Sequence, residues 1–317
     1  MPLRIAIGVL ATLLVITLGI SCVCFFKIFY SRRRKSKKNQ EEYPIPEGKM
    51  YQLFRDQMIE WMDNSKTIPH RDVEITSFDG LILRGKYYEL SPDAPLEILF
   101  HGYKGDSYRD LSGGIARCFS LGHSALVVDH RAAGRSQGHI ISFGANESRD
   151  CEAWVNFAIN NINKDVKIIL TGISMGAATV MITAAKNLPG NVIGVLADCG
   201  YTSCKDIVKK VMRDMKLHAD LLYPFARLGG LLFGRFDTEK ASPIKAMKSC
   251  KLPVIFIHGD HDKFVPHQMS VDNYNACASE YKRLVTIAGA GHGLCYPVDM
   301  KKYEDELQSF FEPLINK

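Results

Sequence analysis

The sequence predicts an α/β protein built on a doubly wound, mostly parallel sheet. Three observations lead to this prediction. Apolar, strand-like runs alternate with helical stretches from residue 96 onward, a β-hairpin pattern precedes them, and a Gly-x-Ser-x-Gly turn at Gly172–Gly176 joins one strand to the next helix. Such alternation places helices on both faces of a parallel sheet. With 317 residues and 46% hydrophobic composition, the chain is long enough to bury that core.

The first element is an apolar segment, Ile5–Phe26, which would be about 33 Å long as a helix and could cross a bilayer core. Four aromatic residues near its end are typical of an interfacial belt: Phe25, Phe26, Phe29 and Tyr30. A cleaved signal peptide is the alternative, but its positive charge would precede the apolar region, where only Arg4 and the amino terminus lie here. We expect residues 1–30 to form an uncleaved N-terminal transmembrane anchor.

The net charge of +6 is concentrated in the basic run at residues 32–38. A nucleic-acid-binding surface would spread its basic residues over a folded face, so we expect no nucleic-acid partner. A basic run beside an apolar segment favours contact with membrane lipid. Residues 31–46, which include Pro44 and Pro46, are expected to be a linker.

The predicted location is a cell membrane, crossed once. The basic run places the following domain on the cytoplasmic side, and nine cysteines without framework spacing suit a reducing compartment. Large domains that follow an N-terminal anchor are nevertheless often exported, so an extracellular domain is the alternative.

Residues 47–317 are expected to form one domain, opening with an amphipathic helix at Glu47–Lys66 and a hairpin of Val73–Ser77 and Leu81–Tyr88. Six runs then have the pattern of strands: Leu96–Phe100, Ala125–Asp129, Val166–Thr171, Val192–Ala197, Val254–His258 and Leu284–Ala288. The helices are expected at Ser107–Leu121, Glu147–Ile162, Met175–Asn187, Pro266–Ser279 and Met300–Leu314. Residues 200–241 interrupt the alternation with apolar helical segments and are interpreted as an inserted lid.

The Gly172–Gly176 turn has the pattern of a nucleophile elbow, in which Ser174 lies between a strand and a helix. The flanking glycines allow strand and helix to approach closely, because a Cβ at either place would collide. The helix that follows points its free N–H groups and positive dipole end at any oxyanion formed at the serine.

A serine hydroxyl needs a histidine base and an anion that orients the histidine. In this fold class the acid and the base follow the serine in that order, each from a loop after a strand. The loop after Val254–His258 offers Asp260 and Asp262, of which Asp262 is favoured because Asp260 lies nearer the strand end and suits turn formation. The glycine-rich loop after the last strand holds His292, the predicted base.

The oxyanion hole needs two donors. We expect the backbone N–H of Met175 to be one and the N–H of Tyr103, in the loop after the first parallel strand, to be the other. The Tyr103 ring could also form a wall of the acyl pocket. His101 is expected to hold this loop in place rather than to act as a second base.

At residues 70–315 the chain resembles an α/β-hydrolase of the serine-hydrolase branch. The resemblance rests on five motifs in order: His101-Gly102, the Asp129–Ser136 loop, the elbow, His258-Gly259 with Asp262, and Gly291-His292. Ala132 stands where the family's Asp-x-Arg-Gly-x-Gly-x-Ser loop has its first glycine. Within the family, the chain is similar to membrane-anchored bacterial hydrolases with a short helical lid and to acyl-ester and oligopeptidase-like enzymes.

The residues and the resemblance together predict a serine hydrolase that cleaves an acyl bond through an acyl-enzyme, with no cofactor and no metal. The apolar lid and the anchor favour a lipophilic carboxylic ester, such as a monoacylglycerol, or a thioester. A serine peptidase of oligopeptidase-like type is the rival enzyme. The alternative from a different functional class is a membrane-tethered binding protein that has the fold but no catalytic activity. The oligomeric state and lid motion are not predicted.

Overall fold

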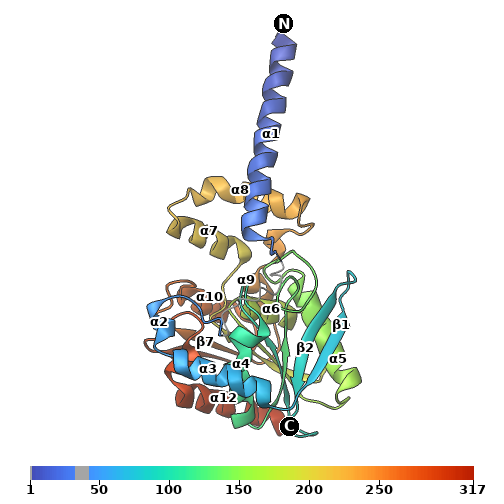
Figure 1. Cartoon of the computed structure of the whole chain (residues 1–317), viewed down its shortest axis with the longest axis vertical. Helices are drawn as coiled ribbons and strands as arrows, with labels where there is room; N and C mark the ends of the chain where they lie inside the picture. Colours follow the sequence, from blue (N-terminus) through green and yellow to red (C-terminus); the bar gives the residue numbers. More distant parts are fainter. Residues whose placement is uncertain (1, 33–42) are drawn as a thin grey trace.

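The computed structural model describes residues 2–32 and 43–317. The N-terminal part of one long helix, α1 (Pro2–Ile28), projects from the rest of the chain, and two helices lie at its base above a sheet-centred domain (Figure 1). The predicted linker at residues 31–46 falls largely outside the described residues.

An eight-stranded sheet forms the centre of the domain, in the order β1-β2-β4-β3-β5-β6-β7-β8. The hairpin strands β1 and β2 are antiparallel to each other, β2 is antiparallel to β4, and the remaining neighbours are parallel. The strands are β1 (Arg71–Thr76), β2 (Ile82–Tyr88), β3 (Leu96–Phe100), β4 (Ser124–Val128), β5 (Ile168–Ile173), β6 (Val192–Asp198), β7 (Val254–Gly259) and β8 (Lys282–Ile287). The predicted doubly wound, mostly parallel sheet is confirmed, with every strand within two residues of its expected ends.

Helices cover both faces of this sheet because alternate strand residues point to opposite sides. In β3, Ile98 packs in the cluster that holds α5 and α6, whereas its neighbour Leu99 packs against α4 on the other face. The helices are α2 (Lys49–Gln52), α3 (Arg55–Thr67), α4 (Ser107–Ser120), α5 (Glu147–Asn161), α6 (Met175–Ala184), α9 (Pro243–Met247), α10 (Gln268–Ala276), α11 (Cys295–Val298) and α12 (Met300–Ile315).

The segment interpreted as a lid contains α7 (Cys204–Asp214), α8 (Ala219–Leu232) and a short 3₁₀ turn, Thr238–Lys240. These elements form their own apolar cluster with α1 and with the loop of Phe143, apart from the clusters on the sheet faces. The insertion therefore stands on the edge of the sheet where the parallel strands end (Figure 1).

The expected aromatic belt is wrong for two of its four members. Phe25 and Phe29 are buried, with 4% and 0% of their surface exposed, and Phe29 packs edge-on against Phe143 and Phe236. They cannot face lipid because the last two turns of α1 are packed into the lid cluster. Phe26 is 52% exposed and keeps an outward position.

The single helix expected at Glu47–Lys66 is also wrong, because it is divided into α2 and α3. Leu53, at the division, is 74% exposed. The bend brings Tyr51 to the loop of His292, where its hydroxyl donates to the His292 carbonyl at 2.8 Å. This tertiary contact competes with continuation of the helix.

Candidate active site

Ser174 lies at the turn from β5 into α6 with φ 56° and ψ −110°, a backbone conformation that L-residues rarely adopt. A Cβ on Gly172 would approach the Gly176 carbonyl carbon to 2.2 Å, and one on Gly176 would approach the Phe100 oxygen to 2.0 Å. Both glycines are therefore required by close packing, and the elbow presents the Ser174 hydroxyl at the end of the sheet.

The structure brings Ser174, His292 and Asp262 together in one chain of hydrogen bonds. The His292 Nε2 lies 3.0 Å from the Ser174 Oγ, and its Nδ1 lies 2.7 Å from the Asp262 Oδ2. Nδ1 must carry the hydrogen, since its partner is a carboxylate that only accepts. Nε2 is then free to accept the proton of the Ser174 hydroxyl.

Four donors surround the Asp262 carboxylate. Oδ1 accepts the backbone N–H groups of Phe264 and Val265, both at 2.8 Å, while Oδ2 accepts from His292 and, at 3.1 Å, from His258 Nε2. Burial acts to raise the pKa of Asp262, but the hydrogen bonds from His258 and His292 outweigh it and hold the pKa well below its usual range. Asp262 therefore stays ionised beside the imidazole.

Asp260, the alternative acid, points elsewhere and accepts the backbone N–H of Gly289 at 2.7 Å. It thus joins the loop after β7 to the loop that carries His292. The residue organises the turn and makes no contact with the His292 ring.

The loop after β3 carries Tyr103 and is held by two side chains. His101 Nε2 accepts the His130 backbone N–H at 3.0 Å, as expected of a residue that fixes this loop. Asp110 accepts the Gly102 backbone N–H at 3.2 Å. Within the described residues, neither the Tyr103 nor the Met175 backbone N–H donates a hydrogen bond, so both remain available to an oxyanion.

Sequence reasoning missed three residues that support the site. Tyr51 and Asp110 lie in segments without a local signal, and their roles depend on tertiary contacts with His292 and Gly102. His258 belonged to a recognised motif, but only the structure aims its ring at Asp262. Its Nε2 faces two acceptors, Asp262 and the Val265 carbonyl at 2.9 Å, so Nε2 carries the hydrogen.

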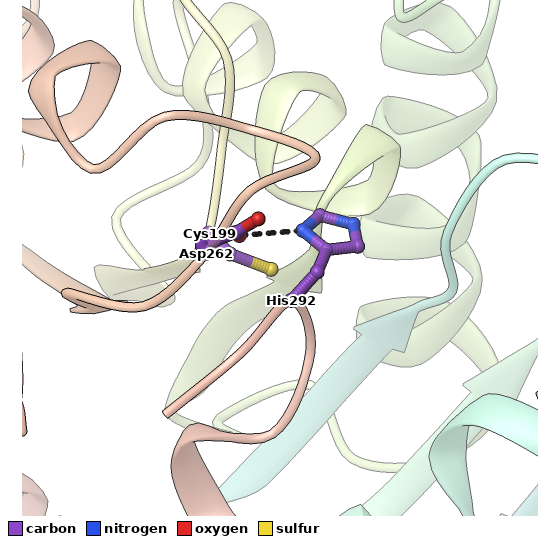
Figure 2. Close-up of side chains that lie close together, drawn as sticks. All are labelled: Cys199, Asp262 and His292. Carbon is purple, nitrogen blue, oxygen red and sulfur yellow. Dashed lines mark hydrogen bonds and ion pairs between the residues drawn. The ribbon is translucent and has the colours of Figure 1, made fainter. Parts of the chain in front are cut away.

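Cys199 lies close to the pair formed by Asp262 and His292 (Figure 2). Its Sγ, one carboxylate oxygen and one ring nitrogen all lie within 4.8 Å of one another, which is the donor set of a zinc site. Burial, together with the charges of Asp198 and Asp262, raises the pKa of the Cys199 thiol well above its usual value. A protonated thiol is a poor ligand, and the Asp262–His292 hydrogen bond already uses the other two groups.

A cavity of about 230 Å³ opens beside the serine. This is smaller than the roughly 300–1,000 Å³ of pockets that enclose drug-sized ligands. Its lining includes Tyr51, Trp61, Tyr103, Ser174, Phe264 and His292. Other lining residues are charged, among them Arg109, Asp110 and Arg117, so the cavity offers both aromatic and polar surface next to the hydroxyl.

Comparison with known proteins agrees with this architecture. A family model described as the alpha/beta hydrolase fold matches residues 98–227. An esterase of Pyrococcus furiosus, Pf2001, has a similar structure with a TM-score of 0.65 and 21% identity, covering 79% of this chain and 94% of that one. The chain has the α/β-hydrolase fold.

Est1E of Butyrivibrio proteoclasticus, whose structure was solved with bound ferulic acid, is also similar (TM-score 0.58, 19% identity, 77% of this chain and 100% of that one). Among curated relatives, YqkD of Bacillus subtilis is 27% identical over 61% of this chain, and bem46 of Schizosaccharomyces pombe is 27% identical over 64%. The chain spans 63% of the length of each of these two relatives.

In the Asp129–Ser136 loop, Ala132 stands where the expected motif has a glycine. Ala132 adopts φ 62°, the left-handed region that glycine favours. The Asp129 carboxylate accepts the backbone N–H groups of Ser107 and Arg135, at 2.9 and 2.8 Å. The bond from Ser107 ties the loop to α4, whereas the bond from Arg135 lies within the loop.

Proposed function

We propose that this α/β-hydrolase is a serine hydrolase that cleaves a lipophilic carboxylic ester through an acyl-enzyme. The observation that carries the proposal is the hydrogen-bond chain from Ser174 through His292 to Asp262, built on a strained elbow. The superfamily fold and the esterases among similar structures support hydrolase activity.

In the proposed mechanism, the Ser174 Oγ attacks the ester carbonyl carbon while His292 Nε2 takes the hydroxyl proton. The backbone N–H groups of Met175 and Tyr103 hold the oxyanion of the tetrahedral intermediate. Collapse breaks the bond to the alcohol oxygen, which leaves with the proton from His292. Water, activated by the same histidine, then releases the acid, and Asp262 keeps the ring oriented throughout.

An ester is preferred to a peptide as substrate. Oligopeptidase-like enzymes carry a large additional substrate domain, whereas the part of the chain described here adds only the lid and α1 to the sheet domain. The aromatic side chains that line the small cavity beside Ser174, among them Tyr51, Trp61 and Phe264, can pack against an acyl chain. A thioester fits the same chemistry. A binding protein without activity is disfavoured because all three triad side chains are in hydrogen-bond contact.

One helix among the described residues, Leu3–Ile28, is long and apolar enough to cross a membrane. We propose that it is a permanent single-pass anchor and not a signal peptide. Burial of Phe25 and Phe29 in the lid cluster supports this, because removal of the helix would expose that cluster. The basic run that follows it favours a cytoplasmic domain.

Turnover of p-nitrophenyl esters of increasing chain length, compared with aminoacyl-amide substrates, tests the proposal. We expect ester turnover that rises with acyl length and is lost in the His292→Ala variant. Faster cleavage of the amides would favour the peptidase. Ester turnover that survives in His292→Ala would refute the proposed site.

A further inference from the structure

The lid has an apolar outer face that no described part of the chain covers. Leu221 and Met215 are 66% and 65% exposed, and four more large apolar side chains, on α8 or directly beside it in the chain, are exposed to a lesser degree. We call this set the outer lid face: Met215, Leu217, Leu221, Leu231, Leu232 and Phe233. Six large apolar side chains grouped on one small insertion indicate a binding surface.

The outer lid face is continuous with the exposed part of α1. Helix α8 crosses α1 at Gly229, where a Cβ would approach the Ser21 carbonyl oxygen to 2.4 Å. Close by, the Phe233 ring lies 5.7 Å from the ring of Phe25. Beyond Ser21, towards the N-terminus, the side chains of α1 are mostly exposed, and Figure 1 shows this part projecting free of the lid.

The length of the free part of α1 determines where the lid lies relative to the membrane surface. Residues 3–20 would span about 27 Å at 1.5 Å per residue, close to the roughly 30 Å hydrocarbon core of a bilayer. If these residues cross the membrane, its surface meets the protein at the level of α8. The outer lid face then lies where the hydrocarbon meets the headgroups.

The charge of the lid fits a phospholipid surface. Cys204–Lys240 contains eight basic and five acidic residues, a net charge of +3. Lys216 lies between two members of the outer lid face, and Lys27 lies on α1 near the crossing. Basic side chains beside an apolar face are the pattern of segments that rest in an anionic membrane surface.

We propose that the outer lid face is embedded in the headgroup region of the phospholipid bilayer that α1 spans, and that the enzyme hydrolyses esters resident in that bilayer. The second part rests on the proposed function. The inner side of the lid supports it, because Lys210 of α7 donates to the Lys263 carbonyl and lies over the Phe264 ring. The Phe264 ring is 5.0 Å from the His292 ring. The inner side of the lid therefore contacts the region of the proposed catalytic histidine, while the outer lid face is turned to the bilayer.

Docking is tested with the full chain in phospholipid vesicles that contain brominated lipid, which quenches tryptophan fluorescence on contact. The Leu221→Trp substitution is compared with Leu90→Trp in a Ser174→Ala background, after subtraction of the signal from Trp61 and Trp154. Leu90 is a matched control because it is 42% exposed and follows Tyr88, which pairs with Ala125 at the opposite edge of the sheet. At least threefold stronger quenching at position 221 is expected, and equal quenching would overturn the docking.

Delivery of the substrate is tested by Leu221→Glu and Leu232→Glu combined, with Leu90→Glu as control. We expect turnover of a vesicle-embedded fluorogenic lipid ester to fall at least tenfold while hydrolysis of soluble p-nitrophenyl acetate is unchanged. Unchanged turnover of the embedded ester, or an equal loss with both substrates, would overturn the delivery role. If the wild-type protein hydrolyses neither ester, the proposed function fails, while the quenching experiment still decides the docking.

Discussion

The Asp262→Asn substitution tests the role of the acid without changing its shape. Because Oδ1 accepts two backbone N–H groups at 2.8 Å, the asparagine oxygen must remain there. Its NH₂ group then replaces Oδ2, 2.7 Å from the His292 Nδ1. Two donors cannot face each other, so Nδ1 loses its hydrogen and Nε2 gains it.

That tautomer directs an N–H at the Ser174 hydroxyl and cannot accept its proton. We expect kcat for p-nitrophenyl butyrate to fall about 10⁴-fold, as in triads where this tautomer has been forced. This corresponds to about 5.5 kcal/mol of transition-state stabilisation.

The matched control is Asp260→Asn, which changes a carboxylate two residues away that contacts Gly289 and not the base. It should retain kcat within about threefold. Thermal unfolding of both variants excludes global loss of structure. The reasoning is refuted if folded Asp262→Asn keeps more than a tenth of wild-type kcat, or if Asp260→Asn loses as much.

Three further predictions follow from buried contacts. Burial acts to raise the pKa of Glu97, but a buried arginine and two hydrogen bonds lower it from 4.5 to about 2. The free energy of unfolding should therefore fall by about 3 kcal/mol as the pH drops from about 4.5 through 2. Urea titrations at several pH values should show a weaker dependence of this free energy on pH in Glu97→Gln than in the wild-type protein. Tyr51→Phe removes the bond to the His292 carbonyl, worth about 1 kcal/mol, and should lower kcat about fivefold in the ester assay; unchanged kcat would exclude a positioning role. Phe29→Ala should reduce the free energy of unfolding in detergent by about 3–5 kcal/mol, whereas exposed Phe26→Ala should leave it nearly unchanged; equal effects would contradict the docking of α1.

The strands were predictable because burial on both sides of a parallel sheet leaves nearly continuous apolar runs, such as Val254–Ile257 and Ala125–Val128. Ser174 was predictable because its backbone strain requires glycines at fixed positions on either side. The proximity of Asp262 and His292 to Ser174 followed from chain order, since each residue lies in a loop after a strand of the same sheet. These signals are local, or depend only on the order of elements.

What the sequence did not predict depends on contacts between distant residues. The division of the helix at Leu53 reflects the bond from Tyr51 to His292, 241 residues away. Phe25 and Phe29 have the composition of a membrane belt, and only the packing of the lid against α1 places them in the interior. No local pattern distinguishes an aromatic side chain that faces lipid from one that faces a lid.

Labelling by a fluorophosphonate probe, with the modified peptide identified by mass spectrometry, tests the central claim most directly. The account predicts one adduct on Ser174 in the wild-type protein, none in Ser174→Ala, and labelling at least 10³-fold slower in His292→Ala. An unlabelled but folded wild-type protein, or equal labelling of Ser174→Ala, would contradict it.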